Sequence, residues 1–221
     1  MIRTCVFVGP SLPGLRSRPD SSIEFATPIR RGDLAAAVDR GVGRVGIIDG
    51  EFGQALAVSV MEIRRALENG IEVWGASSMG ALRAAECDQL GMRGLGWIYE
   101  RYCDGTLTAD DEVALLFHPV TRQALTVPLV NVRWALELAT EAAILSAEAA
   151  QGLLELARRV HYSERRYELL IRTAQDGRVR AHARALAELV AAAQLRCDRK
   201  RLDALMLLRR LEGSSHGGGC D

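Results

Sequence analysis

Apolar residues in the first part of the chain form two alternating patterns. Short apolar runs stand at 4–9 (TCVFVG), 44–50 (RVGIIDG) and 71–75 (IEVWG). Such runs, bounded by turn residues, are typical of buried strands. The segments that alternate with them have apolar residues at helical spacing, at 32–41, 55–70 and 78–91. Strands that alternate with helices predict a parallel sheet with flanking helices.

The remainder of the chain is predicted to be mostly helical from Gly94 onward, with one candidate fourth strand at 112–118 (EVALLFH). Later helices are expected at 128–144, 147–160, 163–175, 178–195 and 198–211. The predicted fold class is therefore α/β, a small parallel sheet with flanking helices followed by an all-helical C-terminal portion. The expected division is an α/β core over 1–145, a helical portion over 146–212 and a disordered tail over 213–221.

Polar residues follow two of the predicted strands. Asp49 and Gly50 come after one, and Gly75-Ala76-Ser77-Ser78 come after the next. Parallel strands end at the same edge of a sheet, where ligands bind. A helix beginning there offers N–H groups that suit an anion or a developing oxyanion. The residues Ser77-Ser78-Met79-Gly80 resemble a nucleophile elbow centred on Ser78, and the alternative is that one serine only caps the helix.

A serine nucleophile needs a base, and the sequence offers few. His118 ends the candidate fourth strand, so Ser78, His118 and Asp49 form one possible triad. Arginine cannot act as a base, and Lys200 is the only lysine. Two other motifs carry little weight. GVGRVG at 41–46 fits the GxGxxG pattern, but a helix precedes it and a strand follows it, which is the reverse of the order in a dinucleotide-binding site. DDE at 110–112 is typical of a solvated turn or a helix start rather than of a metal site.

Composition describes an ordinary globular chain of 221 residues, 48% hydrophobic and 25% charged, with formal net charge zero. Residues 1–150 carry 14 arginines and 19 acidic residues, whereas 151–212 carry 14 basic and 8 acidic residues. The basic segment fits an acidic partner or solvated helix faces. The sequence has no signal-peptide pattern and no apolar run of about 18 residues. Its five cysteines have no CxxC spacing, which favours a cytoplasmic protein with reduced thiols that act as packing residues.

Six sequence blocks, in order, resemble the TfuA family over roughly residues 4–145. They read FVGPSL (7–12), TPIRRGDL (27–34), VGIIDGEF (45–52), EIRRALENGIEVWGASSMGALRAAE (62–86), GMRGLGWIYERYCDGTLTADDEVALL (91–116) and PLVNVRWAL (128–136). The segment GASSMGALRAAE is the most specific of them.

The resemblance implies a role beside YcaO enzymes, which replace a peptide amide oxygen with sulfur. It implies that the YcaO partner uses ATP, that this chain needs no cofactor or metal, and that a precursor peptide is met indirectly. The family acts on the thiocarboxylated C-terminus of a ThiS-like sulfur carrier in a hydrolase-like reaction that releases sulfide. Neither nucleic acid nor a membrane is implied as a partner.

The family's active site is a serine–lysine pair, and the resemblance places the serine at Ser78, with Ser77 as the alternative. Asp49, Gly50, Gly75, Gly80, Arg83 and Glu86 are the expected binding residues. The lysine is expected just before Glu62, where this sequence has Met61. His118 and Glu62 are then the remaining candidate bases. Three functions stay open: sulfide release through a serine, a non-catalytic adaptor for YcaO and the carrier, and an unrelated serine hydrolase.

Overall fold

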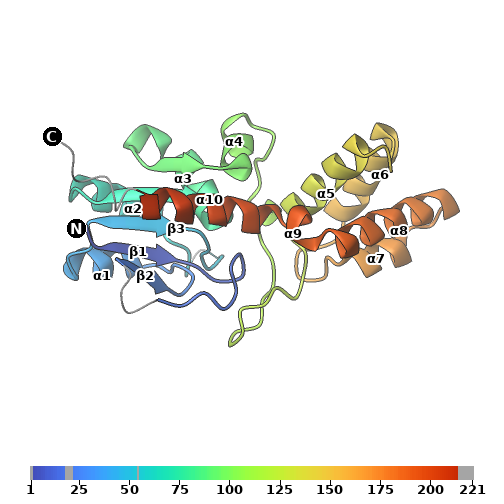
Figure 1. Ribbon diagram of the computed structural model, residues 1–221. Coiled ribbons are helices and arrows are strands. Elements are labelled where there is room, and N and C mark those ends of the chain that lie inside the picture. Colours follow the sequence, from blue (N-terminus) through green and yellow to red (C-terminus); the bar gives the residue numbers. More distant parts are fainter. Residues whose placement is uncertain (1, 18–21, 54, 214–221) are drawn as a thin grey trace. The chain divides into compact units, whose positions relative to one another are not determined.

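The computed structural model describes residues 2–17, 22–53 and 55–213, and the chain divides into two compact units (Figure 1). The first unit comprises residues up to Thr108, the short segment 120–122, and the chain from Lys200 onward. The second unit comprises residues 109–119 and 123–199. The predicted boundary at 145 does not coincide with this division, because the chain leaves the first unit earlier and later returns to it.

A parallel sheet forms the centre of the first unit. Within the described residues its strands are β1 (Thr4–Phe7), β2 (Ile23–Ala26), β3 (Arg44–Ile47), β4 (Glu72–Ala76) and β5 (Arg93–Leu95), in the order β2-β1-β3-β4-β5. The predicted α/β class and its three apolar strands are confirmed. The candidate strand at 112–118 is wrong: that segment holds a 3-10 helix, η2 (Asp110–Glu112), and a single antiparallel bridge from Phe117 to Ala124.

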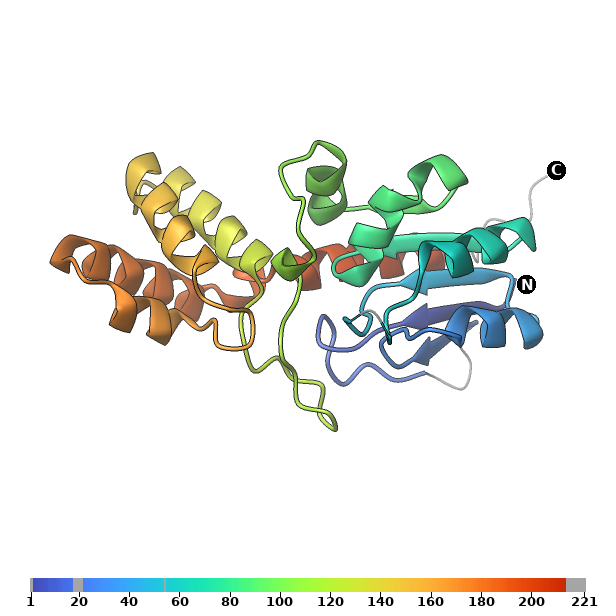
Figure 2. The same cartoon turned by 180° about the vertical axis from the view of Figure 1, so that it is seen from behind.

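Helices cover both faces of this sheet (Figures 1 and 2). They are α1 (Asp33–Asp39), α2 (Val60–Glu68), α3 (Met79–Glu86), the 3-10 helix η1 (Asp88–Leu90), α4 (Trp97–Cys103) and α10 (Arg199–Gly213). Strand alternation assigns Cys5 and Phe7 to the face packed by α1, α2 and α3, and Val6 and Val8 to the face packed by α10. Each face thus has its own buried apolar cluster.

Helix α10 lies across the sheet and presents one buried stripe to it (Figure 1). The stripe repeats at helical spacing and consists of Lys200, Asp203, Ala204, Leu207, Leu208 and Leu211. Asp203 is fully buried, and its carboxylate accepts the N–H groups of Trp97 at 3.3 Å and Ile98 at 2.8 Å. A carboxylate at that position caps the first turn of α4 and locks α10 against the first unit.

The second unit is helical, and its elements match the predicted helices closely. They are α5 (Leu129–Glu141), α6 (Ala147–Arg158), α7 (Tyr167–Thr173), α8 (Gly177–Ala192) and α9 (Gln194–Cys197). These helices enclose a core of their own, built from residues such as Leu136, Leu153 and Leu186. None of the helices in the described part of the chain combines the length and apolarity that crossing a bilayer requires. The predicted disordered tail lies almost entirely outside the described residues.

Two glycines let α3 approach the sheet closely. A Cβ added to Gly80 would overlap the backbone carbonyl of Ile47, and one added to Gly75 would overlap the carbonyl of Gly80. Backbone therefore meets backbone where β3, β4 and the start of α3 come together. This contact fixes the first turn of α3 directly above the carboxyl ends of the two strands.

Substitution of Gly80 by alanine is expected to lower the free energy of unfolding by about 3 kcal/mol, because neither carbonyl has room to move. Gly152, in the middle of α6, has open space around its Cα and supplies a matched control. Gly152→Ala is expected to stabilise its helix by about 0.5–1 kcal/mol. Urea denaturation measures both. Equal effects of the two changes would contradict the close approach at Gly80.

Candidate active site

The carboxyl ends of β1, β3 and β4 bring three polar side chains together in the first unit. Ser11 follows β1, Asp49 follows β3 and Ser77 follows β4. In the strand order, β2 lies on one side of β1, whereas β3, β4 and β5 lie on the other side. The connections that leave β1 and β3 therefore diverge, and such a switch point typically leaves a ligand site at the carboxyl edge of a parallel sheet. All three side chains are at most 2% exposed.

These side chains form a continuous chain of hydrogen bonds. Asp49 Oδ2 accepts the N–H groups of Gly9 at 2.8 Å and Ser11 at 3.0 Å. Ser11 Oγ donates to Asp49 Oδ1 at 2.8 Å and lies 2.9 Å from Ser77 Oγ. Because the single hydroxyl proton of Ser11 goes to the carboxylate, Ser77 is the donor in the second contact. The order Ser77 to Ser11 to Asp49 therefore gives a directed path for a proton.

Lys200 completes this network from α10. Its Nζ lies 3.8 Å from Asp49 Oδ1, and its side chain is 3% exposed. Burial of a lysine beside a carboxylate is costly, and such pairs are retained where they serve a role beyond stability. The only lysine of the chain lies outside the residues that resemble the TfuA family, roughly 4–145, yet it contacts this network. The resemblance expected a lysine near Met61, whereas the structure supplies one from a helix far along the chain.

Ser77 has an uncommon backbone conformation. Its φ is +71°, and the N–H of Ser78 reaches back to the carbonyl of Ala76 at 3.0 Å. The turn is therefore a tight γ-turn with Ser77 at its centre. A non-glycine residue at positive φ stores about 1–3 kcal/mol of strain, and such strain is concentrated at functional sites. Of the two adjacent serines, Ser77 has the geometry of a nucleophile elbow.

Ser78 takes the other role that the sequence left open. It is the N-cap of α3, although its side chain makes no capping hydrogen bond. Its N–H points to the carbonyls of Ile48 and Ala76, and its own carbonyl accepts the N–H groups of Ala81 and Leu82. The geometry consequently favours Ser77 over Ser78 as the reactive hydroxyl.

The other expected binding residues have local structural contacts. Arg83 donates to the Val58 carbonyl at 2.8 Å and pairs with Glu86 at 2.5 Å, so these two side chains join α3 to the segment before α2. A Cβ on Gly50 would meet the Met79 side chain. Gly50, Gly75 and Gly80 thus shape the backbone around the site, and neither Arg83 nor Glu86 joins the Asp49 network through the contacts described.

Met61 and Glu62 lie on α2. The Met61 side chain is 52% exposed, so a lysine there would extend into solvent. Glu62 forms a capping box with Ser59, which accepts the Glu62 N–H while Glu62 accepts the N–H and hydroxyl of Ser59. Gly32 N–H donates to the other oxygen of Glu62 at 2.5 Å. The Glu62 carboxylate therefore stabilises the start of α2 by accepting these hydrogen bonds. This structural role does not suit a general base.

The capping box predicts a pH-dependent stability. Burial opposes ionisation of Glu62, but the Gly32 and Ser59 donors outweigh it and lower its pKa below the ordinary value of 4.5. A depressed folded-state pKa gives stability that is present above the ordinary pKa and is lost as pH falls through the lowered one. Glu62→Gln is therefore expected to lower the free energy of unfolding by about 1 kcal/mol near neutral pH.

The loss should shrink as the pH falls below the ordinary pKa of 4.5 and through the lowered one, because the wild-type carboxylate then also becomes protonated. Urea denaturation over a series of pH values from neutral downward measures it. Glu68→Gln is the matched control on the same helix, since Glu68 makes only an exposed pair with Arg64 and should contribute little. A loss at Glu62 that is independent of pH would contradict the charged cap.

His118 and the acidic triplet belong to the second unit. His118 is exposed, and its N–H donates to the Gln123 carbonyl at 2.9 Å. Glu112 makes a bidentate pair with Arg133 at 2.6 and 2.9 Å, and Asp111 lies 3.6 Å from Arg165. The carboxylates of Asp111 and Glu112 therefore have arginine partners. Ser77 Oγ contacts Ser11 Oγ at 2.9 Å, and the triad of Ser78, His118 and Asp49 stays a prediction.

The cysteines in the described residues do not form a reactive cluster. Cys5, Cys87 and Cys197 are buried, and Cys103 is exposed. Burial raises the pKa of the Cys5 and Cys87 thiols to about 11. Thiolate, the nucleophilic form, is thereby disfavoured at both positions. Their packing agrees with the role that the sequence suggested for them, and Cys220 lies outside the described residues.

Sequence reasoning missed Ser11 and Lys200, although each had a signal. Ser11 follows the first apolar run just as Asp49 and Ser77 follow the next two, so the strand-end argument applies to it equally. Lys200 occupies the first position of a stripe that continues through Ala204 and Leu208. That spacing puts Lys200 on the buried face of its helix.

Comparison with known proteins agrees with this architecture. A family model described as TfuA-like protein matches residues 49–166. The matched region contains Asp49 and Ser77 and excludes Ser11 and Lys200. No curated protein matches the chain. Since the family model spans more than half of the sequence, the chain belongs to the TfuA-like protein family.

Proposed function

We propose that this TfuA-like protein is a hydrolase-like accessory protein for YcaO-dependent thioamidation of peptide backbones. Its substrate is the thiocarboxylated C-terminus of a ThiS-like sulfur carrier, and its product is sulfide for the YcaO partner, which uses ATP. The observation that carries the proposal is the bonded series that runs from Ser77 through Ser11 to the Asp49–Lys200 pair. A strained serine joined to a buried acid–base pair is typical of acyl-transfer sites.

The first step is attack of Ser77 Oγ on the thiocarboxylate carbon. The Ser77 proton passes to Ser11 Oγ as the Ser11 proton passes to the Asp49–Lys200 pair. For the pair to accept this proton, Lys200 starts as the neutral amine beside the Asp49 carboxylate, 3.8 Å away, and ends as the ammonium. The positive end of the α3 dipole stabilises the developing oxyanion.

The second step releases sulfur. The C–S bond breaks, and the departing sulfur takes the one proton held by the Asp49–Lys200 pair and leaves as hydrosulfide, HS⁻. Water then attacks the acyl–Ser77 ester, which yields the free carboxylate of the carrier and restores the serine. The balance is one thiocarboxylate and one water in, one carboxylate and one sulfide out, so no oxidant or reductant is required.

A non-catalytic adaptor for YcaO and the carrier is the second candidate. The observation that favours it is the closure of the site, since Ser77 is 0% exposed and Ser78 only 2%. An acyl carbon reaches Ser77 only after part of the surrounding backbone moves. If the protein is hydrolase-like, binding of YcaO or of the carrier would drive this movement of the backbone.

Sulfide release from a thiocarboxylated carrier tests the two candidates. The protein is expected to release sulfide, faster with the YcaO partner present, and to leave a carrier that ends in a normal carboxylate by mass spectrometry. Binding of YcaO and carrier without sulfide release, with or without the partner, would support the adaptor. An ester substrate hydrolysed at rates comparable to the carrier would instead support an unrelated serine hydrolase.

A further inference from the structure

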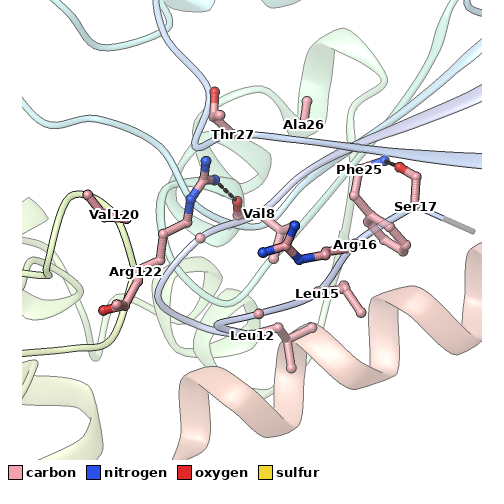
Figure 3. A pocket seen from close by; sticks show the side chains of 13 residues that line it. Val8, Leu12, Leu15, Arg16, Ser17, Phe25, Ala26, Thr27, Val120 and Arg122 are labelled. Carbon is pink, nitrogen blue, oxygen red and sulfur yellow. Dashed lines mark hydrogen bonds between the residues drawn. The ribbon is translucent and has the colours of Figure 1, made fainter.

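A cavity of about 560 Å³ lies in the first unit beside the carboxyl ends of β1 and β2. Its walls are the loop after β1, the end of β2 at Phe25–Thr27, and the segment 120–122 (Figure 3). Sites for small molecules typically measure about 300–1,000 Å³, so the cavity has the size of a ligand site. The hydrolytic network does not use it.

Two guanidinium groups enter this cavity from different segments. Arg16 comes from the loop after β1, and Arg122 comes from the segment 120–122 (Figure 3). Arg122 has a φ of +59°, and its Nη1 donates to the Val8 carbonyl at 3.1 Å, which directs the side chain along the wall. Among the contacts described, neither guanidinium has a carboxylate partner. Two positively charged groups from separate segments thus line one cavity.

The rest of the lining is apolar with a few hydroxyls. Leu12, Leu15 and Phe25 supply apolar surface, and Thr27 adds a hydroxyl to the lining (Figure 3). Ser17 is already engaged, because its Oγ accepts the Phe25 N–H at 2.8 Å and fixes the loop to β2. Apolar walls bury the body of a ligand, while a few polar groups determine its orientation.

The geometry points to an anion-binding site in this cavity, for a carboxylate or phosphate group carried on an apolar body. Paired guanidinium forks bind either anion through two parallel N–H···O contacts. The site is separate from the proposed hydrolysis. Its loop is shared, however, because Gly9 lines the cavity while its N–H holds Asp49 Oδ2 at 2.8 Å. Failure of anion binding and failure of sulfide release are nevertheless distinguishable, because Arg16 and Arg122 take no part in the contacts that join Ser77, Ser11, Asp49 and Lys200.

Calorimetric titration of the full chain tests the site with four probes. Phenylacetate and phenyl phosphate carry both the apolar body and the charge, phenylacetamide lacks the charge, and acetate lacks the body. A dissociation constant of about 0.1–1 mM is expected for at least one of the first two. Phenylacetamide and acetate are each expected to bind at least about tenfold more weakly. The ratio between phenylacetate and phenyl phosphate identifies the anion that the site prefers.

Arg16→Gln is expected to weaken the preferred probe about tenfold or more, without loss of stability, because the Arg16 side chain is exposed. Arg65→Gln, an exposed arginine of α2 that does not line the cavity, is the matched control and should leave binding unchanged. Three results would overturn the inference: equal binding of phenylacetate and phenylacetamide, equal losses in the two variants, or no binding of either anion at about 5 mM.

Discussion

Replacement of Lys200 by arginine is expected to abolish sulfide release while the protein stays folded. Arginine places a permanent positive charge beside Asp49, which lies 3.8 Å from the Nζ of Lys200, and it cannot accept a proton because it does not lose one near neutral pH. Since the proposed mechanism needs the Asp49–Lys200 pair to receive the serine proton, the rate constant of sulfide release should fall about 10²–10⁴-fold in Lys200→Arg. The measurement is single-turnover sulfide release, alongside circular dichroism as a check of folding.

Lys200→Met provides the contrasting control. It removes the amine altogether, and it leaves Asp49, 1% exposed, without its lysine partner. Breaking a buried pair in this way costs about 3–5 kcal/mol, so this variant should also unfold at lower urea concentration. Normal sulfide release by Lys200→Arg would contradict a proton-accepting role for the lysine and reduce it to a counter-ion. An inactive Lys200→Arg with full stability would support the role.

Removal of the Ser77 hydroxyl is expected to have the second large effect. Ser77→Ala should lower sulfide release by at least about 10³-fold, because it removes the hydroxyl that carries the acyl group in the proposed mechanism. Ser78→Ala is the matched control one residue away, and it should lose less than about tenfold, since the Ser78 side chain makes no capping bond. The reverse ranking would return the reactive role to Ser78.

Ser77→Gly separates the backbone strain at this position from its chemistry. Glycine adopts the φ of +71° without penalty, whereas alanine retains the strain. Ser77→Gly should therefore be more stable than Ser77→Ala by about 1 kcal/mol, although both lack the hydroxyl and both are inactive. Thermal denaturation of the two variants measures the difference. Equal stability would mean that the turn relaxes and that the elbow is not under strain.

The central strands were predictable from sequence because they are buried on both faces. β3 and β4 read as continuous apolar runs, and their ends located Asp49 and Ser77. The edge strands gave no such signal: β5 is only three residues long and begins with the exposed Arg93. Val113 and Ala114 misled the prediction because they are buried in a loop of the second unit and not in a strand.

The choice between two adjacent serines was not available from sequence. Both have the same chemistry, and only the backbone distinguishes them, through the positive φ at Ser77. The spacing of Gly75 and Gly80 around Ser77 becomes informative once their contacts are known, since each allows backbone to meet backbone. Lys200 was not counted among the candidate site residues, because it lies outside the residues that resemble the family. Its place in the regular buried stripe of α10 nevertheless indicates a lysine on the buried face of that helix.

The return of α10 to the first unit has a consequence for the order of events during synthesis. The strands that carry Ser11, Asp49 and Ser77 leave the ribosome early, whereas Lys200 follows only after all of the second unit has been made. Until α10 has been made, the sheet face that contains Val6 and Val8 is not covered by this helix, and Asp49 has no contact with the amine of Lys200. Contacts over such long sequence separations form late in folding. A nascent chain is therefore expected to hold an assembled serine network without its proton acceptor, so that hydrolytic competence arises only with docking of α10.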